Sequence, residues 1–504
     1  MQRKFNHTPK PKAPSHPAMG QIAAKLQEAQ ALHSQGQLSR ARVLYERVLK
    51  VVPMHFDALN ALGMIAGQTG SPQRAAVLFE KAIEADPGNV CAYVNKGLAL
   101  HASMSLEAAL ESYDEAIAKQ IDHAEAHFNR GNVLLELGQT EAALASYDAA
   151  ISINENYVEA YCNRGVVQSQ LEQFDAALAS YDRAISLRPD YAKAYFNRAL
   201  VWLAKGVFAR GWADYEWRLH FDHGPGGVGA GGLPPPRRWL GQEPLTGETI
   251  LLRGEQGFGD TLQFCRYARL AAEAGARVIL EVQKPLLSLL STLEGVSQLI
   301  AKGSPLPHFD YHCSLMSLPL AFKTDLATIP RTEKYLRSDP VKLAQWQSRL
   351  GEKTRPRVGL VWSGSATNRN ERNRSFPVAD LLPHLPPQFE YFRLQKDAPM
   401  ADEKTLRSNP RVRDFSGDFK DFSDTAALCD CMDVVISTCT SVAHLSAALG
   451  RNTWILLGHA ADWRWLLDRN DSPWYPSARL YRRSRAEGWN AVFERVAADL
   501  ALTF

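Results

Sequence analysis

Apolar, small and polar positions recur between Gln21 and His220, each at every 34th position. The aromatic positions are Tyr45, Phe79, Tyr113, Tyr147, Tyr181 and Tyr215, and the small positions are Gly63, Gly97, Gly131, Gly165 and Ala199. Alanines, asparagines and prolines recur with the same spacing at three further positions of the repeat. Five kinds of residue that each recur every 34 positions predict a repeat array in which each unit is a hairpin of two helices. The small residue lets the helices approach closely, and the aromatic ring fills the space beside it.

The array resembles the tetratricopeptide repeat, which implies an α-solenoid. We assign five repeats to residues 21–190 and a sixth, degenerate pair to 191–220, so the whole repeat region is expected to cover 21–220. The last pair is set apart by Ala199 in place of glycine, Gly211 in place of alanine, and by Trp212, Trp217 and Arg218. These changes are typical of a capping or docking unit.

A ladder of asparagines follows the first helices of the repeats and consists of Asn95, Asn129, Asn163 and Asn197. An arginine comes directly after three of them. Asparagine amides on a concave surface can hydrogen-bond an extended peptide backbone, so the functional interpretation is the recruitment of a protein or peptide partner. The alternative is that these amides satisfy neighbouring helix ends and that the array only spaces or dimerises the protein.

A glycine- and proline-rich segment over residues 221–244 separates the array from a different pattern. Short apolar runs now alternate with amphipathic stretches, which is typical of the strands and helices of a parallel sheet. The clearest runs are 250–252, 278–282, 358–362, 389–394, 434–437 and 453–458. We predict two α/β halves, 245–345 and 355–483, and a C-terminal helix over 484–504. In such sheets, ligands bind beyond the carboxyl ends of the strands.

Composition narrows the class of protein. The 504 residues suffice for about three domains, and a content of 45% hydrophobic and 22% charged residues is ordinary for a folded soluble protein. Lys+Arg 57 against Asp+Glu 54 gives a net charge of only +3, so no nucleic-acid partner is expected. The seven cysteines are irregularly spaced, which indicates reduced thiols, and they offer no zinc-ligand spacing.

The chain contains no run of ~18 apolar residues, so no membrane span is expected. Residues 1–20 carry four basic residues, four prolines and no acid, and they lack the apolar middle of a secretory signal. We therefore predict a disordered basic arm at this end. Together with the cysteine pattern, this favours a cytoplasmic protein.

Three loops that follow predicted strands carry the candidate chemistry. In the first loop, Gly257 and Gly259 allow close backbone approach, and Asp260 begins a helix. The Asp260 carboxylate is either a helix cap or a general base. The second loop is suited either to holding an anionic leaving group or to being a solvated basic segment. Its residues are Ser363, Gly364, Ser365, Arg372 and Arg374.

The third loop joins an apolar strand to a helix rich in small residues. Free amides at the start of that helix, with the hydroxyls of Thr440 and Ser441, form a natural cradle for a diphosphate. His444 lies one turn into the helix and either faces the same site or packs in the core. Cys439 has no base assigned beside it, which disfavours a thiolate nucleophile.

Together, these loops resemble glycosyltransferase family 9, the heptosyltransferase-like group, and most of all its branch fused to tetratricopeptide repeats. The segments that carry the resemblance are EQGFGDTLQFCRY (255–267), VGLVWSGS (358–365), RNRS (372–375), STCTSVAHLSAALG (437–450), DWRW (462–465) and SPWYP (472–476). The match covers about residues 239–483. It implies a GT-B fold, a metal-independent reaction without a cofactor, and a nucleotide sugar held mainly by the second half as co-substrate.

The resemblance also implies roles for single residues. The acid of the G-x-G-D turn, which deprotonates the acceptor hydroxyl, corresponds to Asp260. The donor-phosphate pattern D-[ST]-x-x-x-H-L corresponds to Thr440 and His444, but its acid is replaced here by Cys439. His444 and arginines would then neutralise the leaving diphosphate. The C-terminal helix is expected to pack across onto the first half, and the identity of the sugar stays open.

The sequence thus predicts an α + α/β protein, with an N-terminal tetratricopeptide α-solenoid followed by a GT-B-type pair of Rossmann-like α/β domains. The predicted function is metal-independent transfer of a sugar from a nucleotide sugar to an acceptor hydroxyl, with the array recruiting a protein or peptide acceptor. One alternative is a non-catalytic scaffold carrying a degenerate GT-B domain. Another is a transferase for glycan or lipid-linked acceptors whose repeats serve only assembly.

Overall fold

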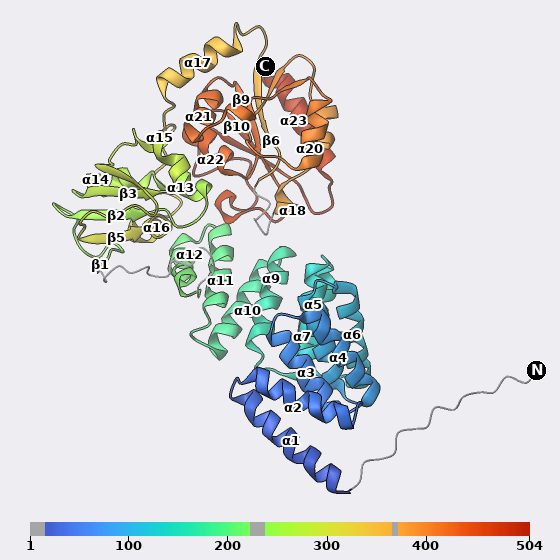
Figure 1. Cartoon of the computed structure of the whole chain (residues 1–504). Helices are drawn as coiled ribbons and strands as arrows, with labels where there is room; N and C mark the ends of the chain where they lie inside the picture. Colours follow the sequence, from blue (N-terminus) through green and yellow to red (C-terminus); the bar gives the residue numbers. More distant parts are fainter. Residues whose placement is uncertain (1–15, 222–236, 365–370) are drawn as a thin grey trace, which may run out of the picture. The chain divides into compact units, whose positions relative to one another are not determined.

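The computed structural model describes residues 16–221, 237–364 and 371–504, and the chain divides into two compact units, Met1–Asp190 and Tyr191–Phe504 (Figure 1). The helices of the first unit pack as consecutive antiparallel pairs. They are α1 (His16–Ser34), α2 (Leu38–Val51), α3 (Phe56–Gln68), α4 (Pro72–Ala85), α5 (Val90–Ala102), α6 (Leu106–Lys119), α7 (Ala124–Glu136), α8 (Thr140–Ile153), α9 (Val158–Gln170) and α10 (Phe174–Leu187). The five predicted repeats are therefore present as five helical hairpins.

Two predicted segments fall largely outside the described residues. Residues 1–15 of the predicted basic arm and residues 222–236 of the predicted linker both do so. The rest of the arm differs from the prediction, because α1 begins at His16, so residues 16–20 are helical rather than disordered. The first helix of the array thus starts slightly earlier than the repeat spacing indicated.

The spacing of small and aromatic residues reflects a contact inside each hairpin. The glycine of the first helix faces the aromatic ring of the second: a Cβ added at Gly97 would lie 2.5 Å from the ring of Tyr113, and one at Gly165 equally close to Tyr181. Both tyrosine rings are almost fully buried. Because no side chain fits between the two helices of these hairpins, both require a glycine at this position.

The sixth helical pair belongs to the second unit. It consists of α11 (Ala192–Ala204), α12 (Phe208–Tyr215) and the 3₁₀ turn η1 (Glu216–His220). The indole of Trp212 is buried, and its Nε1 donates to the carbonyl of Thr324 at 2.9 Å. The same ring packs edge-to-face against Trp463, with centroids 5.3 Å apart. The sixth pair is thus docked on the α/β region, which agrees with the docking interpretation of its altered residues.

The first α/β half is a five-stranded parallel sheet with the strand order β1-β5-β2-β3-β4. Its strands are β1 (Arg237–Arg238), β2 (Thr249–Arg253), β3 (Arg277–Val282), β4 (Gln298–Ala301) and β5 (Tyr311–Ser314). Its helices are α13 (Phe258–Phe264), α14 (Tyr267–Glu273), α15 (Leu287–Leu290) and α16 (Leu318–Ala321). The chain order reverses between β2 and β5, and α13 begins beyond the carboxyl end of β2.

The second half is a six-stranded parallel sheet with the order β11-β10-β9-β6-β7-β8, the order found in dinucleotide-binding Rossmann sheets. Its strands are β6 (Arg357–Val361), β7 (Glu390–Arg393), β8 (Val412–Arg413), β9 (Val434–Thr438), β10 (Thr453–Leu457) and β11 (Ala478–Arg482). Its helical segments are α17 (Pro340–Leu350), α18 (Glu371–Arg374), α19 (Val378–Leu381), α20 (Met400–Arg407), α21 (Phe422–Asp430), α22 (Ser441–Ala448), η6 (Trp463–Trp465) and α23 (Trp489–Thr503). The switch point of this sheet lies between β6 and β9.

The predicted C-terminal helix is α23, but its packing differs from the expectation. Its apolar side chains, such as Phe493 and Val496, join the core of the second half, where Phe493 meets Phe376 with ring centroids 4.8 Å apart. The expectation that this helix packs onto the first half was therefore wrong. The apolar stripe of α23 matches a face of its own sheet, and burial there removes the stripe from water.

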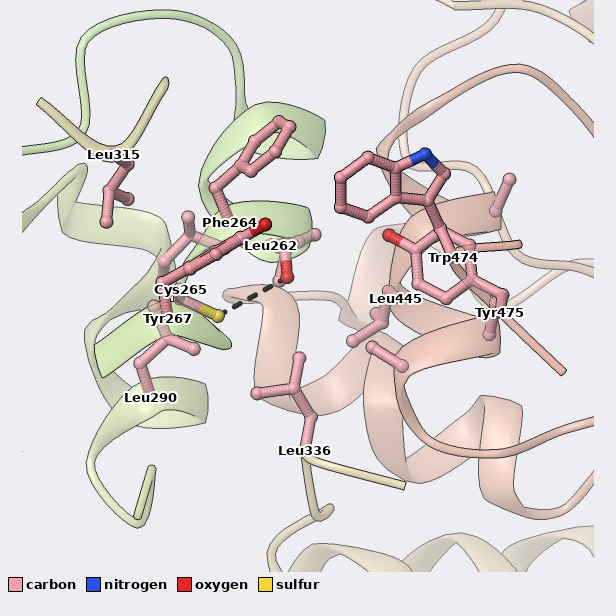
Figure 2. Close-up of a cluster of buried hydrophobic side chains, with 14 of the residues drawn as sticks. Leu262, Phe264, Cys265, Tyr267, Leu290, Leu315, Leu336, Leu445, Trp474 and Tyr475 are labelled. Atoms are coloured by element: carbon pink, nitrogen blue, oxygen red, sulfur yellow. Dashed lines mark hydrogen bonds between the residues drawn. The ribbon is translucent and has the colours of Figure 1, made fainter. Parts of the chain in front are cut away.

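The two halves share one hydrophobic core. A single cluster of buried side chains contains residues of the sixth helical pair and of both sheets. Figure 2 shows Leu262 and Phe264 of α13 facing Trp474 of the second half, and the rings of Phe264 and Trp474 lie 5.6 Å apart. In the described part of the chain, no helix is long and apolar enough to cross a membrane.

Candidate functional site

The candidate site lies where α13 of the first half meets α22 of the second. Gly259 marks the contact, because a Cβ added to it would lie 2.9 Å from Cδ2 of His444 and 3.6 Å from Cα of Ser441. Both helices start beyond the carboxyl end of a strand at the switch point of their sheet. The structure thus brings together the first and third loops that the sequence singled out, although they belong to different sheets and are far apart in the chain.

Asp260 both caps its helix and reaches the other half. Its Oδ2 accepts from the amide of Gly257 at 2.8 Å, and its Oδ1 accepts from Nη2 of Arg464 at 2.5 Å. The side chain keeps 22% of its surface exposed. Burial raises the pKa of the Asp260 carboxyl, whereas the guanidinium of Arg464 acts in the opposite direction. The carboxylate therefore caps α13 from the third position of the helix, by accepting from the amide of the N-cap residue Gly257.

His444 is buried in α22 and uncharged at neutral pH. Its Nδ1 lies 2.9 Å from the hydroxyl of Tyr475, and its ring stacks on Trp465 with centroids 5.4 Å apart. Burial lowers the pKa of His444 to about 3, with a further contribution from the positive charge of Arg464. Without a bound anion the ring is therefore neutral, and the role of His444 in neutralising a leaving diphosphate stays a prediction. In the tautomer in which Tyr475 donates to Nδ1, Nε2 carries the proton and can donate one hydrogen bond.

Backbone donors at the start of α22 are unused. Among the described residues, the amides of Ser441, Val442 and Ala443 have no acceptor, and neither does Nε2 of His444. Thr440 is the N-cap residue of α22, but its side chain makes no capping hydrogen bond, and its buried hydroxyl lies 3.2 Å from that of Ser437. Aligned free amides attract anions because of their partial positive charge. The third loop is thus the part of the site whose donors are free.

The second loop is arranged differently from the expectation. Ser363 uses its hydroxyl and amide on the side chain of Gln395, and the amide of Gly364 donates to Glu371 at 2.5 Å. Arg374 pairs with Glu371 and donates to the carbonyl of Cys439 at 2.8 Å. These polar groups, which the sequence assigned to phosphate binding, are therefore engaged within the protein.

Two further members of that predicted set are not described. Ser365 lies outside the described residues, and so does the side chain of Arg372. Cys439, by contrast, is well defined: its Sγ accepts from Nε1 of Trp465 at 3.1 Å, and burial raises its pKa to about 11. At neutral pH Cys439 is therefore a thiol, which agrees with the expectation that it is no thiolate nucleophile.

Sequence reasoning missed several residues of this site. Arg464, Tyr475 and Gln263 surround Asp260 and His444, and Glu371 occupies the second loop. Arg464 and Tyr475 lie in segments that contributed to the family resemblance, but nothing in the sequence assigned them a partner. One signal for Arg464 was present in the sequence, because this residue is flanked by Trp463 and Trp465. A charged residue between two large apolar residues tends to be buried, and a buried charge must be paired.

The asparagine ladder of the array makes contacts between side chains. Asn95 donates to Asn60 at 3.1 Å, and Asn163 donates to Asn132 at 2.8 Å. Asn129 is 7% exposed. These bonds favour the interpretation that the amides satisfy neighbouring groups, and the role of the ladder in peptide binding, including that of Asn197, stays a prediction.

The arginines beside the ladder join consecutive repeats. Nε of Arg130 in α7 donates to Asp114 of the preceding repeat at 2.6 Å, while Nη1 donates to Ser146 of its own repeat at 2.8 Å. Arg164 repeats this pattern one unit later with Asp148 and Ser180. These arginines therefore fix the contact between neighbouring hairpins.

The buried neutral His444 predicts a pH-dependent stability. Between pH 6.5 and about 3, His444 binds a proton in the unfolded chain but not in the folded chain. Protonation of the unfolded chain therefore lowers the free energy of unfolding as the pH falls below 6.5, whereas above pH 6.5 this loss is absent. We expect the loss of unfolding free energy between pH 7 and pH 4.5 to be smaller by about 2 kcal/mol in His444→Gln than in the wild type. Denaturant unfolding at the two pH values measures it. An equal loss in both proteins would contradict the assignment.

The repeat array matches known protein families. Residues 131–172 match the family described as TPR repeat, and residues 26–90, 112–145 and 158–191 match families described as tetratricopeptide repeat. The array consists of tetratricopeptide repeats. Arrays of this kind present extended surfaces for protein interaction, which is the role that the repeats support here.

A curated relative extends the similarity beyond the array. Protein FlbA of Caulobacter vibrioides is 27% identical over 331 residues, which cover 59% of this chain and 53% of FlbA. This chain therefore spans about half the length of that relative. Because the first unit ends at Asp190, a match of this length continues into the second unit.

Solved structures of tetratricopeptide proteins are similar to part of this chain. YrrB, a tetratricopeptide protein with an unusual peptide-binding site, is 26% identical, with a TM-score of 0.31, and the match covers 34% of this chain and 88% of YrrB. TTC0263, a tetratricopeptide protein of Thermus thermophilus, is 23% identical, with a TM-score of 0.31, and the match covers 36% of this chain and 99% of TTC0263.

Proposed function

We propose that this protein is a glycosyltransferase with a GT-B fold, which moves a sugar from a nucleotide sugar to an acceptor hydroxyl. The observation that carries the proposal is the meeting of two loops at Gly259. On one side lies a carboxylate, Asp260, and on the other lies a helix start with unused amides beside His444. The strand orders of the two sheets support the GT-B arrangement, since both halves have a switch point at this contact.

In this proposal the nucleotide diphosphate is held by α22. The free amides of Ser441 to Ala443 and the hydroxyls of Thr440 and Ser441 donate to its phosphate oxygens, and Nε2 of His444 donates a hydrogen bond from a neutral ring. These donors are already oriented by the helix and by Tyr475, so they need no reorganisation when charge develops on the leaving group.

The transfer step is a substitution at the anomeric carbon of the sugar. The acceptor oxygen forms a bond to the anomeric carbon of the sugar, and the bond from that carbon to the diphosphate oxygen breaks. The hydroxyl proton passes to the carboxylate of Asp260, and the electron pair of the broken bond leaves with the nucleotide diphosphate. The negative charge that results lies at the start of α22, where the helix amides stabilise it.

The tetratricopeptide array supplies the acceptor in this proposal. Its repeats are joined by arginine contacts into a continuous surface, as a docking site for an extended protein segment requires. Recruitment by a separate unit would raise the local concentration of an acceptor that the transferase unit binds weakly.

Ligand-induced stabilisation tests the donor site. From a panel of UDP, GDP, ADP, CMP and their common sugars, we expect one nucleotide to stabilise the full chain by about 2.7 kcal/mol at a concentration of 100 times its Kd. The stabilisation should be reduced in His444→Gln and retained in the control His101→Gln, which lies in the array. A thermal-shift series measures both.

A second candidate function is a scaffold that carries an inactive transferase domain. It is favoured by one specific observation: the polar groups of Ser363, Gly364 and Arg374 are already used by Gln395 and Glu371. No stabilisation by any nucleotide of the panel, in a protein that unfolds cooperatively, would overturn the transferase proposal and favour the scaffold.

A further inference from the structure

Arg464 of the second half donates hydrogen bonds to acceptors of the first half. Its side chain is 7% exposed. Nε donates to Oε1 of Gln263 at 2.7 Å, and Nη2 donates to Oδ1 of Asp260. On its own side, Arg464 is held by Asp462, whose two carboxylate oxygens accept from Nη1 at 3.0 and 3.1 Å. A guanidinium held on three sides has a single orientation, so together with the amide of Gly257 it orients the Asp260 carboxylate.

The residue that follows Arg464 contacts the donor end of the site. Trp465 stacks on the ring of His444, and its Nε1 donates to Sγ of Cys439 at 3.1 Å. The turn η6 therefore contacts the carboxylate of the first half through one residue and the start of α22 through the next. The two ends of the candidate site are linked by this short segment of the second half.

We propose that Arg464 is a positioning residue for Asp260, which orients the base and makes it competent only while the second half is docked on the first. This inference rests on the proposed function, in which Asp260 accepts the acceptor proton. Arg464 itself touches no reacting atom in this scheme. Its donors are used on Asp260, Asp462 and Gln263, so it acts through the carboxylate that it holds.

The charged groups around Asp260 explain why the arginine matters. The groups that face the carboxylate are Arg464 and Asp462 of η6, Glu255 of its own loop, and Tyr215 of α12. Arg464 is the cation among these groups, and the others are acids. Glu255 is itself paired with Arg218, whose Nη2 lies 2.8 Å from Oε1 of Glu255. Without Arg464, burial and the carboxylate of Asp462 both favour protonated Asp260, so the pKa of Asp260 would rise. A protonated carboxyl cannot accept the proton of the acceptor.

The experiment compares Arg464→Met and Arg464→Lys with the wild type in the full chain. We expect Arg464→Met to lower kcat at pH 7 about a hundredfold and to move the acidic limb of the pH profile upward by at least about one pH unit. Arg464→Lys keeps a charge but not the planar fork, so its kcat should lie between those of the wild type and Arg464→Met. The Kd of the nucleoside diphosphate, measured by calorimetry, should change less than about threefold in both.

The matched control is Arg479→Met, which removes an arginine paired with Asp499 at the surface of the second half. It should leave kcat and the pH profile at wild-type values. A wild-type pH profile in Arg464→Met would overturn the positioning role, as would an equal loss of nucleotide affinity and kcat. If Arg464→Met fails to fold, Arg464→Lys decides the question, and a wild-type kcat in that variant overturns the role. Absence of transfer by the wild type would instead overturn the proposed function.

Discussion

Asp260→Asn is expected to lower kcat for glycosyl transfer by a factor of about 100 to 10,000, because an amide cannot accept the proton of the acceptor hydroxyl. The substitution is nearly isosteric, and the amide oxygen can still accept from the backbone of Gly257, so the start of α13 is kept. Binding of the nucleoside diphosphate should persist, since its proposed contacts lie on α22. Steady-state kinetics and calorimetry on the same preparation measure the two effects separately.

The matched control for this variant is Asp430→Asn. Asp430 is also paired with an arginine, since its Oδ1 accepts from Nε of Arg451 at 2.6 Å, and its side chain is more deeply buried than that of Asp260. This control reports the cost of breaking a buried ion pair outside the candidate site. Asp260→Asn with wild-type kcat would refute the base assignment, and equal losses of kcat in the two variants would attribute the effect to folding.

Trp212→Ala is expected to destabilise the second unit by about 3 to 5 kcal/mol. The indole is 1% exposed, packs on Trp463 and Trp474, and donates to the carbonyl of Thr324. Its removal leaves a cavity and an unpaired buried carbonyl. Hydrogen exchange on the full chain should be faster over residues 191–504 than in the wild type.

The comparison variant is Trp217→Ala. Trp217 is half-buried and stacks on Tyr195, with ring centroids 4.1 Å apart, so its loss should cost less than that of Trp212. Exchange in helices α1 to α10 should be unchanged in both variants, because those helices belong to the other unit. A loss below about 1 kcal/mol for Trp212→Ala would contradict the docking role of the sixth pair.

The repeat array could be predicted because its contacts are local. The glycine and the aromatic ring that meet in each hairpin lie in consecutive helices, as with Gly131 of α7 and Tyr147 of α8, so the spacing in the sequence is also the spacing of the contact. The parallel strands were predictable for a related reason. A strand buried on both faces must be apolar for most of its length, as β9 and β10 are, and such runs are visible in the sequence.

The candidate site could be predicted only in part. Gly259, Asp260 and His444 were recognised from their loops, and the structure brings these loops together. The neutral state of His444 could not be predicted, because it depends on burial against Trp465 and Tyr475, which come later in the chain. The engagement of the second loop was missed partly for the same reason, because Gln395 and the carbonyl of Cys439 come later in the chain. Glu371 lies in the loop itself and was overlooked.

The sequence by itself determined the helical hairpins, the parallel strands and the positions of the loops that follow them, because these depend on residues close in the chain and on the alternation of apolar and polar positions. Only the tertiary structure decided which charges are paired and which are lost. Asp260 and Arg464, for example, come from different halves and meet only when the two sheets pack together. Whether a buried group stays ionised depends on the partners that packing brings to it, and no local pattern encodes those partners.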